Sequence, residues 1–235
     1  MKKMLHKASE RIQNDFGWLR IQASFREDGI TEDKRRFGKL VIVDDALMIP
    51  GGRGFKLHPH ENMEIISWVL SGTDEHNDSK NGITLLHGGD VQLMSAGTGI
   101  EHAENNHSLT EALHMFQLWI EPSRKGIVPA YQTKSLRNAL KPNELLTFVS
   151  PTGENDSLVI NQQAYLSIVA LDAGERLGYT LREKGNGVYI FIVLGHVVVD
   201  STTLFHRDAI GVHSCDHIDV DAKVFSQVLF IEVPM

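Results

Sequence analysis

Several features that define whole classes of protein are scarce in these 235 residues. A single cysteine, Cys215, excludes an internal disulfide. No apolar run approaches the length of about 18 residues that a membrane span needs. The N-terminus is charged, and no hydrophobic signal segment follows it. Together these absences predict a cytoplasmic protein.

Basic charge is scarce as well. The formal net charge is −7 and the isoelectric point is near 5.9, whereas a protein that binds nucleic acid generally presents a basic face. We therefore expect no direct nucleic-acid binding. Apolar residues at 42% and charged residues at 23% are ordinary for a soluble globular chain. The length allows one large β domain or two smaller ones.

Helical periodicity is nearly absent from the chain. Short β-rich runs separated by glycine turns dominate instead, among them residues 64–70, 83–86, 91–94 and 114–120. This pattern predicts an all-β sandwich or barrel. The best helical candidate, residues 134–144, is short and contains Pro142. The surrounding segment, residues 122–144, is predicted to be a linker that divides the chain.

Two polar stretches are predicted to be irregular. Residues 26–36 separate two β-rich runs and are expected to form a loop. Residues 74–82 are expected to be turn-like, since Asn81-Gly82 is a strong hairpin signal.

The second half of the chain repeats the first weakly. Val69-Leu70-Ser71-Gly72 has an echo in Val193-Leu194-Gly195. Leu118-Trp119-Ile120-Glu121 has one in Leu229-Phe230-Ile231-Glu232. Because the echoes keep their order, they indicate two copies of one β unit.

Histidine is the residue that the chain has in excess, and much of it is clustered: the cluster comprises His58, His60, His76, His87, His102, His107 and His114. His58 and His60 are two apart, as are His102 and Glu104. On a β-strand, residues two apart point to the same face. If the two strands are neighbours in a barrel, these four side chains converge.

Three imidazoles and one carboxylate suit Fe(II), Mn(II), Ni(II), Cu(II) or Zn(II). Four protein ligands on an octahedral ion leave two positions open, as an oxygenase needs for substrate and dioxygen. An isolated His-x-His pair is more often a solvated strand face, and the second pair is what favours ligation. Glu64 is open to three interpretations: a fifth ligand, a base, or a polar residue that opens a strand. The remaining histidines of the cluster are predicted to be surface or structural residues.

These spacings resemble the two cupin motifs. The first is approached by Gly52-(x5)-His58-x-His60-(x3)-Glu64-(x7)-Gly72, whose last spacer is one residue longer than usual. The second is approached by Gly89-(x5)-Ser95-x-Gly97-(x4)-His102-(x3)-Asn106, with Ser95 where proline is usual and a longer spacer before the histidine.

More narrowly, the chain resembles the pirin family of bicupins over residues 17 to about 122. The blocks that carry the resemblance are Gly17-Trp18-Leu19, His58-Pro59-His60, Val69-Leu70-Ser71-Gly72, His76-Asn77-Asp78-Ser79, residues 92–104 and Gln117-Leu118-Trp119-Ile120. The resemblance implies two cupin barrels (double-stranded β-helices of the jelly-roll type) packed together, with few short helices. We expect an N-terminal metal-binding cupin over residues 1–130 and a degenerate, metal-free C-terminal cupin over residues 131–235.

The resemblance also implies a ligand set. By position, the family's metal ligands fall on His58, His60, His102 and Glu104, with iron as the usual ion and other divalent metals accepted by related proteins. Glu64 is then expected to support the site or the structure without binding the metal.

The second half is expected to lack such a site. Counted from the echo at Val193-Leu194, the positions of His58 and His60 fall on Arg182 and Lys184. Gly89-Asp90-Val91 has a further echo in Arg207-Asp208-Ala209, and counted from Asp208 the positions of His102 and Glu104 fall on Val220 and Ala222. Two cations and two apolar side chains cannot ligate a metal. The C-terminal cupin is therefore expected to cover the first barrel and close its pocket.

Several pirin-like proteins show quercetin 2,3-dioxygenase activity, so the resemblance implies oxidative ring opening of a flavonol-like phenolic. The substrate hydroxyl and O2 would meet at the metal, and Glu104 would take the phenolic proton. The alternative is a metal- or redox-sensing regulator that binds a protein partner without turnover, which needs the same ligands. The match departs from the family at residues 26–34, where related proteins usually carry an aromatic-rich stretch.

Overall fold

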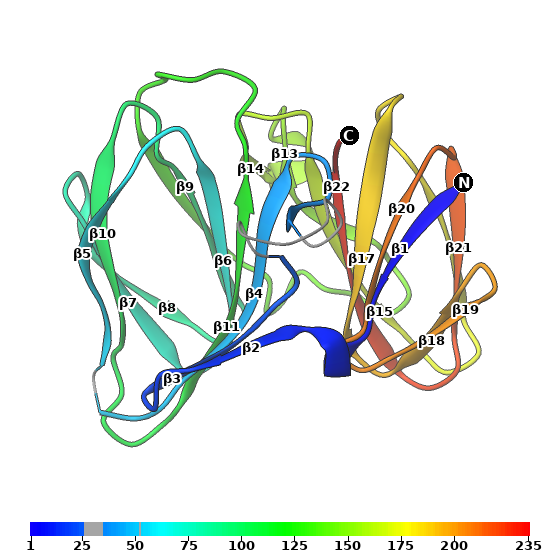
Figure 1. The fold of residues 1–235 in the computed structure, drawn as a ribbon, viewed down its shortest axis with the longest axis horizontal. Helices are drawn as coiled ribbons and strands as arrows, with labels where there is room; N and C mark the ends of the chain where they lie inside the picture. Colours follow the sequence, from blue (N-terminus) through cyan, green and yellow to red (C-terminus); the bar gives the residue numbers. More distant parts are fainter. Residues whose placement is uncertain (26–34, 52) are drawn as a thin grey trace.

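The computed structural model describes residues 1–25, 35–51 and 53–235. It contains two β-barrels side by side, formed by the two halves of the chain (Figure 1). The described residues include two short 3₁₀ turns, η1 (Ala8–Glu10) and η2 (Glu154–Asp156). Neither is long or apolar enough to cross a membrane. The predicted all-β architecture of two packed cupin barrels is confirmed.

Each barrel consists of a seven-stranded and a four-stranded sheet. In the N-terminal barrel the larger sheet has the order β12 (Ala130–Ser135), β9 (Asp90–Ser95), β6 (Glu64–Ser71), β11 (Leu113–Ile120), β4 (Leu40–Met48), β3 (Leu19–Ala23) and β2 (Ile12–Asp15). The smaller sheet has the order β5 (Gly54–His60), β10 (Ile100–Asn106), β7 (Thr73–Asp78) and β8 (Gly82–His87).

The C-terminal barrel follows the same plan. Its larger sheet has the order β1 (Lys2–His6), β20 (Ala209–His213), β17 (Asn186–Leu194), β22 (Ser226–Pro234), β15 (Tyr165–Leu171), β13 (Leu146–Ser150) and β14 (Leu158–Val159). Its smaller sheet has the order β16 (Arg176–Thr180), β21 (His217–Ala222), β18 (His196–Val199) and β19 (Thr202–Phe205).

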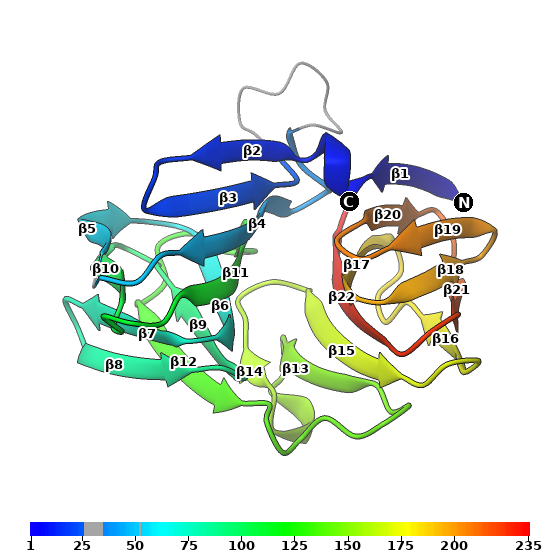
Figure 2. The same ribbon diagram turned by 90° about the horizontal axis from the view of Figure 1, so that it is seen from below.

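Strand pairing crosses the boundary between the two halves at both ends. β1 pairs with β20 of the C-terminal barrel, and η1 then leads the chain back to β2 and β3 of the N-terminal barrel (Figure 2). β12 pairs with β9 and so extends the N-terminal barrel to Ser135. The division of the chain at residues 130 and 131 stays a prediction, and any such boundary must allow for the exchange of β1.

The two barrels share a core. One apolar cluster joins buried residues of both large sheets, among them Val43, Phe116 and Leu118 from the first barrel and Tyr189 and Phe191 from the second. The rings of Phe116 and Phe191 meet edge to face with centroids 4.9 Å apart, a geometry worth about 0.5–1.5 kcal/mol beyond the area that it buries. The barrels are therefore packed as one body.

An ion cluster lies at the margin of this core. Asp45 is buried, and its carboxylate lies 2.6 Å from His114 Nε2 and 3.3 Å from Arg207 Nε. Arg207 also stacks over the ring of Phe116, 4.9 Å from its centroid. Although burial alone would raise the pKa of Asp45, its hydrogen bond with His114 and the charge of Arg207 lower it. Since Arg207 belongs to the second half of the chain, the cluster ties the two barrels together.

Two local predictions are wrong. Residues 134–144 form no helix: Lys134 and Ser135 end β12, and turns follow. Pairing with β9 satisfies the backbone there, so tertiary context overrides a weak local preference. Residues 74–82 are mostly strand and not turn, but the hairpin signal at Asn81-Gly82 is confirmed, since β7 and β8 pair as a hairpin with a short turn between Asp78 and Gly82. Residues 26–34 of the loop predicted over residues 26–36, and Gly52 of the first motif, lie outside the described residues.

Candidate metal centre

The two pairs of predicted ligands lie on adjacent strands. β5 carries His58 and His60, β10 carries His102 and Glu104, and the two strands pair antiparallel with His58 opposite His102. A bulge follows, because the register shifts between His102 and Glu104. Such irregularities re-aim side chains beside functional sites. The predicted pairing of these two strands is confirmed.

The three imidazoles converge inside the barrel. The ring centroids of His58 and His102 lie 4.6 Å apart, and each lies 4.8 Å from that of His60. One ring nitrogen from each of the three falls within 4.8 Å of the other two. That spacing allows a single ion to contact all three.

The nitrogens that face the centre are free to bind. The Nε2 atoms of His60 and His102 are buried and have no hydrogen-bond partner among the described residues. An unpaired buried nitrogen is costly unless a ligand satisfies it. His58 bonds the carbonyl of Lys56 through Nδ1 at 2.7 Å, which leaves its Nε2 as the lone-pair nitrogen. The residues present therefore fit a divalent transition metal.

Burial keeps the imidazoles of His60 and His102 neutral. It lowers the pKa of His60 to about 4, with His102 and His58 adding to the shift. It lowers the pKa of His102 to about 3, with His76 and His58 as further causes. Because a metal binds the neutral imidazole, both rings hold a usable lone pair at neutral pH.

Glu104 is buried at the same centre and is held by three donors. Its Oε1 accepts hydrogen bonds from Ser67 Oγ at 3.1 Å and Gln92 Nε2 at 2.8 Å, and its Oε2 accepts one from Gln117 Nε2 at 2.6 Å. Its carboxylate groups with His102 and His76 within 4.8 Å, not with His58 and His60. The four-residue ligand set therefore stays a prediction in which His102 joins Glu104 to the other histidines.

Glu64 lies apart from both groups of possible ligands. Its side chain on β6 is buried, its Oε2 accepts hydrogen bonds from Ser95 Oγ at 2.7 Å and the Asn161 N–H at 3.3 Å, and its Oε1 has no partner among the described residues. Burial raises its pKa to about 6. Through Asn161 it touches the second half of the chain, a placement compatible with a supporting role outside the ligand set.

The main feature that the sequence reasoning missed is the inward face of β7. Asp74, His76 and Asp78 alternate on that strand and are all buried. His76 was expected to be a surface or structural histidine, yet it lies 3.5 Å from His102 through their Nδ1 atoms. Burial raises the pKa of Asp74 well above its usual range, with Glu104 adding to the shift. The period of two along residues 74–78 was the signal that could have revealed this face.

The other clustered histidines lie away from the centre. His87 and His107 are exposed, and His107 pairs with Glu75 at 2.8 Å. His114 belongs to the ion cluster between the barrels. None of these three is in either group of possible ligands among the described residues.

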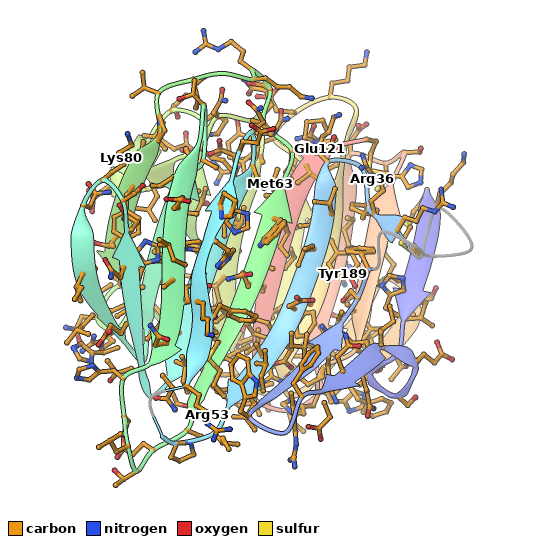
Figure 3. The ribbon with its side chains drawn as sticks, turned by 60° about the vertical axis from the view of Figure 1, so that its left-hand side comes forward. Arg36, Arg53, Met63, Lys80, Glu121 and Tyr189 are labelled. Carbon is orange, nitrogen blue, oxygen red and sulfur yellow. The ribbon has the colours of Figure 1, made fainter. Side chains whose placement is uncertain are left out.

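An open cleft of about 900 Å³ adjoins the centre. Its apolar lining includes Phe25, Met63 and Trp119, and the Trp119 ring meets that of His60 edge to face at 4.9 Å. Figure 3 shows Met63 and Glu121 towards one end of the barrel and Arg53 at the other. Asp44 also lines the cleft, and burial raises its pKa to about 6.

The C-terminal barrel has a different interior. β16 and β21 take the places of β5 and β10 in its smaller sheet. Leu177 stands opposite Val220 there, as His58 stands opposite His102, and Tyr179 follows in the place of His60. These positions belong to an apolar cluster, so none of them offers a metal ligand.

Two of the four positions assigned to the C-terminal barrel from the sequence were wrong. Arg182 and Lys184 lie beyond the end of β16, and the Arg182 guanidinium bonds Thr147 Oγ1 at 2.7 Å instead of facing the barrel interior. The loops between strands differ in length between the halves, so counting residues from an echo does not preserve register. Val220 and Ala222 do face inward.

The fold and this centre define the class: a bicupin whose N-terminal barrel carries a histidine-lined metal-site geometry. The Pirin family profile matches residues 6–120, and the profile of the quercetinase C-terminal cupin domain matches residues 147–233. The chain belongs to the pirin family.

Two curated relatives match nearly the whole chain. Quercetin 2,3-dioxygenase of Escherichia coli K12 is 34% identical over 231 residues, which cover 98% of each chain. A putative quercetin 2,3-dioxygenase of Pseudomonas aeruginosa is 34% identical over 219 residues, covering 92% of this chain and 93% of the relative. The crystal structure of the bacterial pirin YhhW from E. coli in complex with nickel(II) superposes with a TM-score of 0.92 at 32% identity, covering 99% of both chains.

Proposed function

We propose that this chain is a metal-dependent dioxygenase of the quercetin 2,3-dioxygenase type that acts on a flavonol-like phenolic. The observation that carries the proposal is the convergence of three histidines, two of them with buried, unpaired Nε2 atoms, beside an open cleft. The names of the full-length relatives support the substrate class. A cytoplasmic location stays part of the proposal.

The proposed ligands are His58, His60, His102 and Glu104, and the proposed ion is Fe(II), with Mn, Ni, Cu and Zn as alternatives. A bound ion would supply a Lewis acid for the substrate hydroxyl and a centre at which substrate and dioxygen exchange electrons. The nickel in the related pirin structure supports a divalent ion in this fold.

Glu104 is the proposed proton acceptor. Ser67, Gln92 and Gln117 all donate to its carboxylate, the pairing that an ionised acid requires. The hydrogen bonds continue from Glu104 through Gln117 to the cleft, because Gln117 Oε1 accepts the Trp119 indole N–H at 3.0 Å. The base is thus held in place by the side chain that also positions a cleft wall.

The cleft provides the proposed substrate site. Phe25, Met63 and Trp119 give it apolar and aromatic walls on which a planar phenolic ring can pack. Asp44 gives it a carboxyl group that can accept a hydrogen bond from a second substrate hydroxyl. In this proposal the ring packs on these walls while the reacting hydroxyl points past Trp119 towards Glu104.

Oxygen uptake with quercetin tests the proposal. We expect iron-loaded protein to consume one O2 per quercetin on an oxygen electrode, and a small panel of flavonols to rank the substrates. His58→Ala and Glu104→Ala should lower the rate by more than about 100-fold, because even residues that merely support metal ligands cost about 10–100-fold. His87→Ala, which removes an exposed histidine of the same barrel, is the matched control and should keep the wild-type rate.

The opposite outcome has a clear meaning. Iron-loaded protein that holds one ion per chain but consumes no O2 with any flavonol would overturn the dioxygenase proposal. A partner protein that then co-purifies only with the metal-loaded form would favour the regulatory alternative, which uses the same ligands.

A further inference from the structure

Two of the three buried polar residues on the inward face of β7, His76 and Asp78, form a hydrogen-bonded series that the proposed reaction does not use. His76 and Asp78 stand in register with Glu104 and His102 of the neighbouring strand β10, and both side chains are fully buried. Polar groups inside a barrel are costly unless each is paired. Asp78, His76 and His102 form a hydrogen-bonded series, and the pattern of its hydrogen bonds indicates which nitrogen of each imidazole carries the proton.

The series begins at Asp78. Its Oδ1 accepts the backbone N–H groups of Lys80 and Asn81, each at 2.7 Å, and its Oδ2 lies 3.1 Å from His76 Nε2. The side-chain amide of Asn81 donates to both oxygens, at 3.2 and 3.1 Å. A carboxylate with only donors around it is ionised and accepts from His76. His76 therefore carries its proton on Nε2.

The proton on Nε2 determines the rest of the series. A neutral imidazole has one donor and one acceptor, so His76 Nδ1 is an acceptor. It faces His102 Nδ1 at 3.5 Å, at the long end of the hydrogen-bond range. His102 then carries its proton on Nδ1, and its Nε2 holds the lone pair. That is the buried nitrogen with no partner among the described residues.

We propose that Asp78 and His76 are positioning residues that hold His102 in its Nδ1–H tautomer and so present its Nε2 lone pair to the metal. The inference rests on the proposed metal centre, but not on the flavonol chemistry. The Lys56 carbonyl holds His58 in the same Nδ1–H tautomer by accepting its Nδ1–H. Carboxylate and carbonyl partners of this kind are a general device for orienting histidine ligands.

A second contact holds the relay in place. The His76 ring stacks on Tyr131 of β12, with centroids 4.7 Å apart and planes at 19°. Tyr131 Oη donates to Gln92 Oε1 at 2.8 Å, and Gln92 Nε2 donates to Glu104. One network thus orients both His102 and Glu104, the two predicted ligands on β10.

The geometry admits one competing arrangement. His76, His102 and Glu104 could themselves hold an ion deeper in the barrel, since they also form a group within 4.8 Å. His76 would then be a ligand and not a relay. In the relay His102 carries its proton on Nδ1, and in the competing arrangement on Nε2. The His76→Phe variant should still bind one ion in the relay and should lose the ion in the competing arrangement.

The direct test is the protonation of His102 in metal-free protein, read by long-range ¹H–¹⁵N NMR of the imidazole nitrogens. We expect the Nδ1–H tautomer in wild type. Asp78→Asn should invert it: the backbone N–H groups hold the new amide oxygen, so the amide NH2 faces His76 and reverses each donor along the series. Wild type with the proton of His102 on Nε2 would overturn the proposal without the use of any variant, metal or substrate.

Metal affinity provides the second arm. Asp78→Asn and His76→Phe, which keeps the stack on Tyr131, should weaken Ni(II) binding about 10–100-fold while one ion per chain still binds at saturation. Asp90→Asn is the matched control, because Asp90 also accepts a turn N–H, that of His87 at 2.8 Å, but lies outside both groups of possible ligands. Unchanged affinity in Asp78→Asn, or complete loss of the ion in His76→Phe, would contradict the relay.

Discussion

The three histidines of the centre differ in what their rings contact. His58 uses a backbone carbonyl, His102 uses another imidazole, and His60 packs against the Trp119 ring. A ligand whose tautomer is set before the metal arrives loses less freedom on binding. His58 and His102 are therefore preorganised at the level of single protons.

Glu64 supplies a prediction about pH at this scale. Its folded pKa of about 6 lies above the ordinary value of 4.5, so the folded protein binds this proton more tightly than the unfolded chain does. The resulting stabilisation is fully present below pH 4.5 and is lost as the pH rises through 6. Glu64→Gln has no such loss. Between pH 4 and pH 8, its unfolding free energy should rise relative to wild type by about 2 kcal/mol.

Urea unfolding of the two proteins across that range measures the effect. Glu101→Gln is the control, because the Glu101 side chain is exposed on β10, and its difference from wild type should not change with pH. A constant difference between Glu64→Gln and wild type would show that Glu64 is not titrating abnormally. Metal binding should survive in Glu64→Gln, since Glu64 lies outside both groups of possible ligands.

At the residue scale, the spacing of the histidines predicted which side chains converge, but the sequence could not predict how they are protonated. Residues two apart on a strand share a face, so the convergence of His58, His60 and His102 could be predicted once the strands were assumed to be neighbours. Protonation could not be predicted, because it depends on Asp78 and His76, which approach His102 only through the pairing of β7 with β10.

At the scale of elements, the centre depends on the close approach of β5 to β10. Gly54 opens β5, and a Cβ atom there would overlap the carbonyl oxygen of Glu104 and the backbone of Asn105. Backbone atoms of a paired strand cannot move aside cheaply. Glycine at this position therefore lets the two strands that carry the predicted ligands meet.

Gly54→Ala should force the strands apart. We expect an unfolding free energy lower by about 1–3 kcal/mol and Ni(II) affinity lower by more than about 10-fold, because ligand geometry tolerates little displacement. Both are measurable, by denaturant titration and by calorimetry. Gly178→Ala is a matched control on β16: its Cβ would come closest to the exposed His217 ring, at 2.7 Å, which can turn away. Wild-type affinity in Gly54→Ala would contradict this role.

The polar sequence of β7 explains why this strand was predicted to be turn-like. Its sequence, Thr73 to Asp78, is polar throughout, and polar residues ordinarily mark turns and surfaces. In this barrel the inward face is polar because it surrounds the proposed metal centre, so the usual contrast between apolar and polar faces is missing. Strands such as β6 and β11, with apolar faces on the shared core, were predictable for the opposite reason.

At the scale of the whole molecule, one fold is used with two interiors. The N-terminal barrel surrounds histidines, carboxylates and amides, whereas the C-terminal barrel is filled by apolar side chains, with Tyr179 stacked on Phe230 at 4.7 Å. The second barrel packs on the first through the shared apolar core and the Asp45 ion cluster. We propose that its contribution is structural support and that it carries no metal.

The architecture of two barrels was predictable because the echoes and the motifs keep their order along the chain. The exchange of β1 was not, since residues 2–6 pair with β20 about two hundred positions away, and nothing local marks that partner. The strand register of the second barrel could not be predicted by counting residues either. Counting assigned Arg182 to the place of His58, whereas Leu177 occupies that place.

The central claim is that one divalent ion binds in the N-terminal barrel between His58, His60, His102 and Glu104. The most direct measurement is the anomalous difference map of a crystal grown with one equivalent of Ni(II). We predict a single peak per chain, within bonding distance of those four side chains. A peak between His76, His102 and Glu104 with His58 and His60 unbound, a peak in the C-terminal barrel, or no peak in either barrel would contradict the claim.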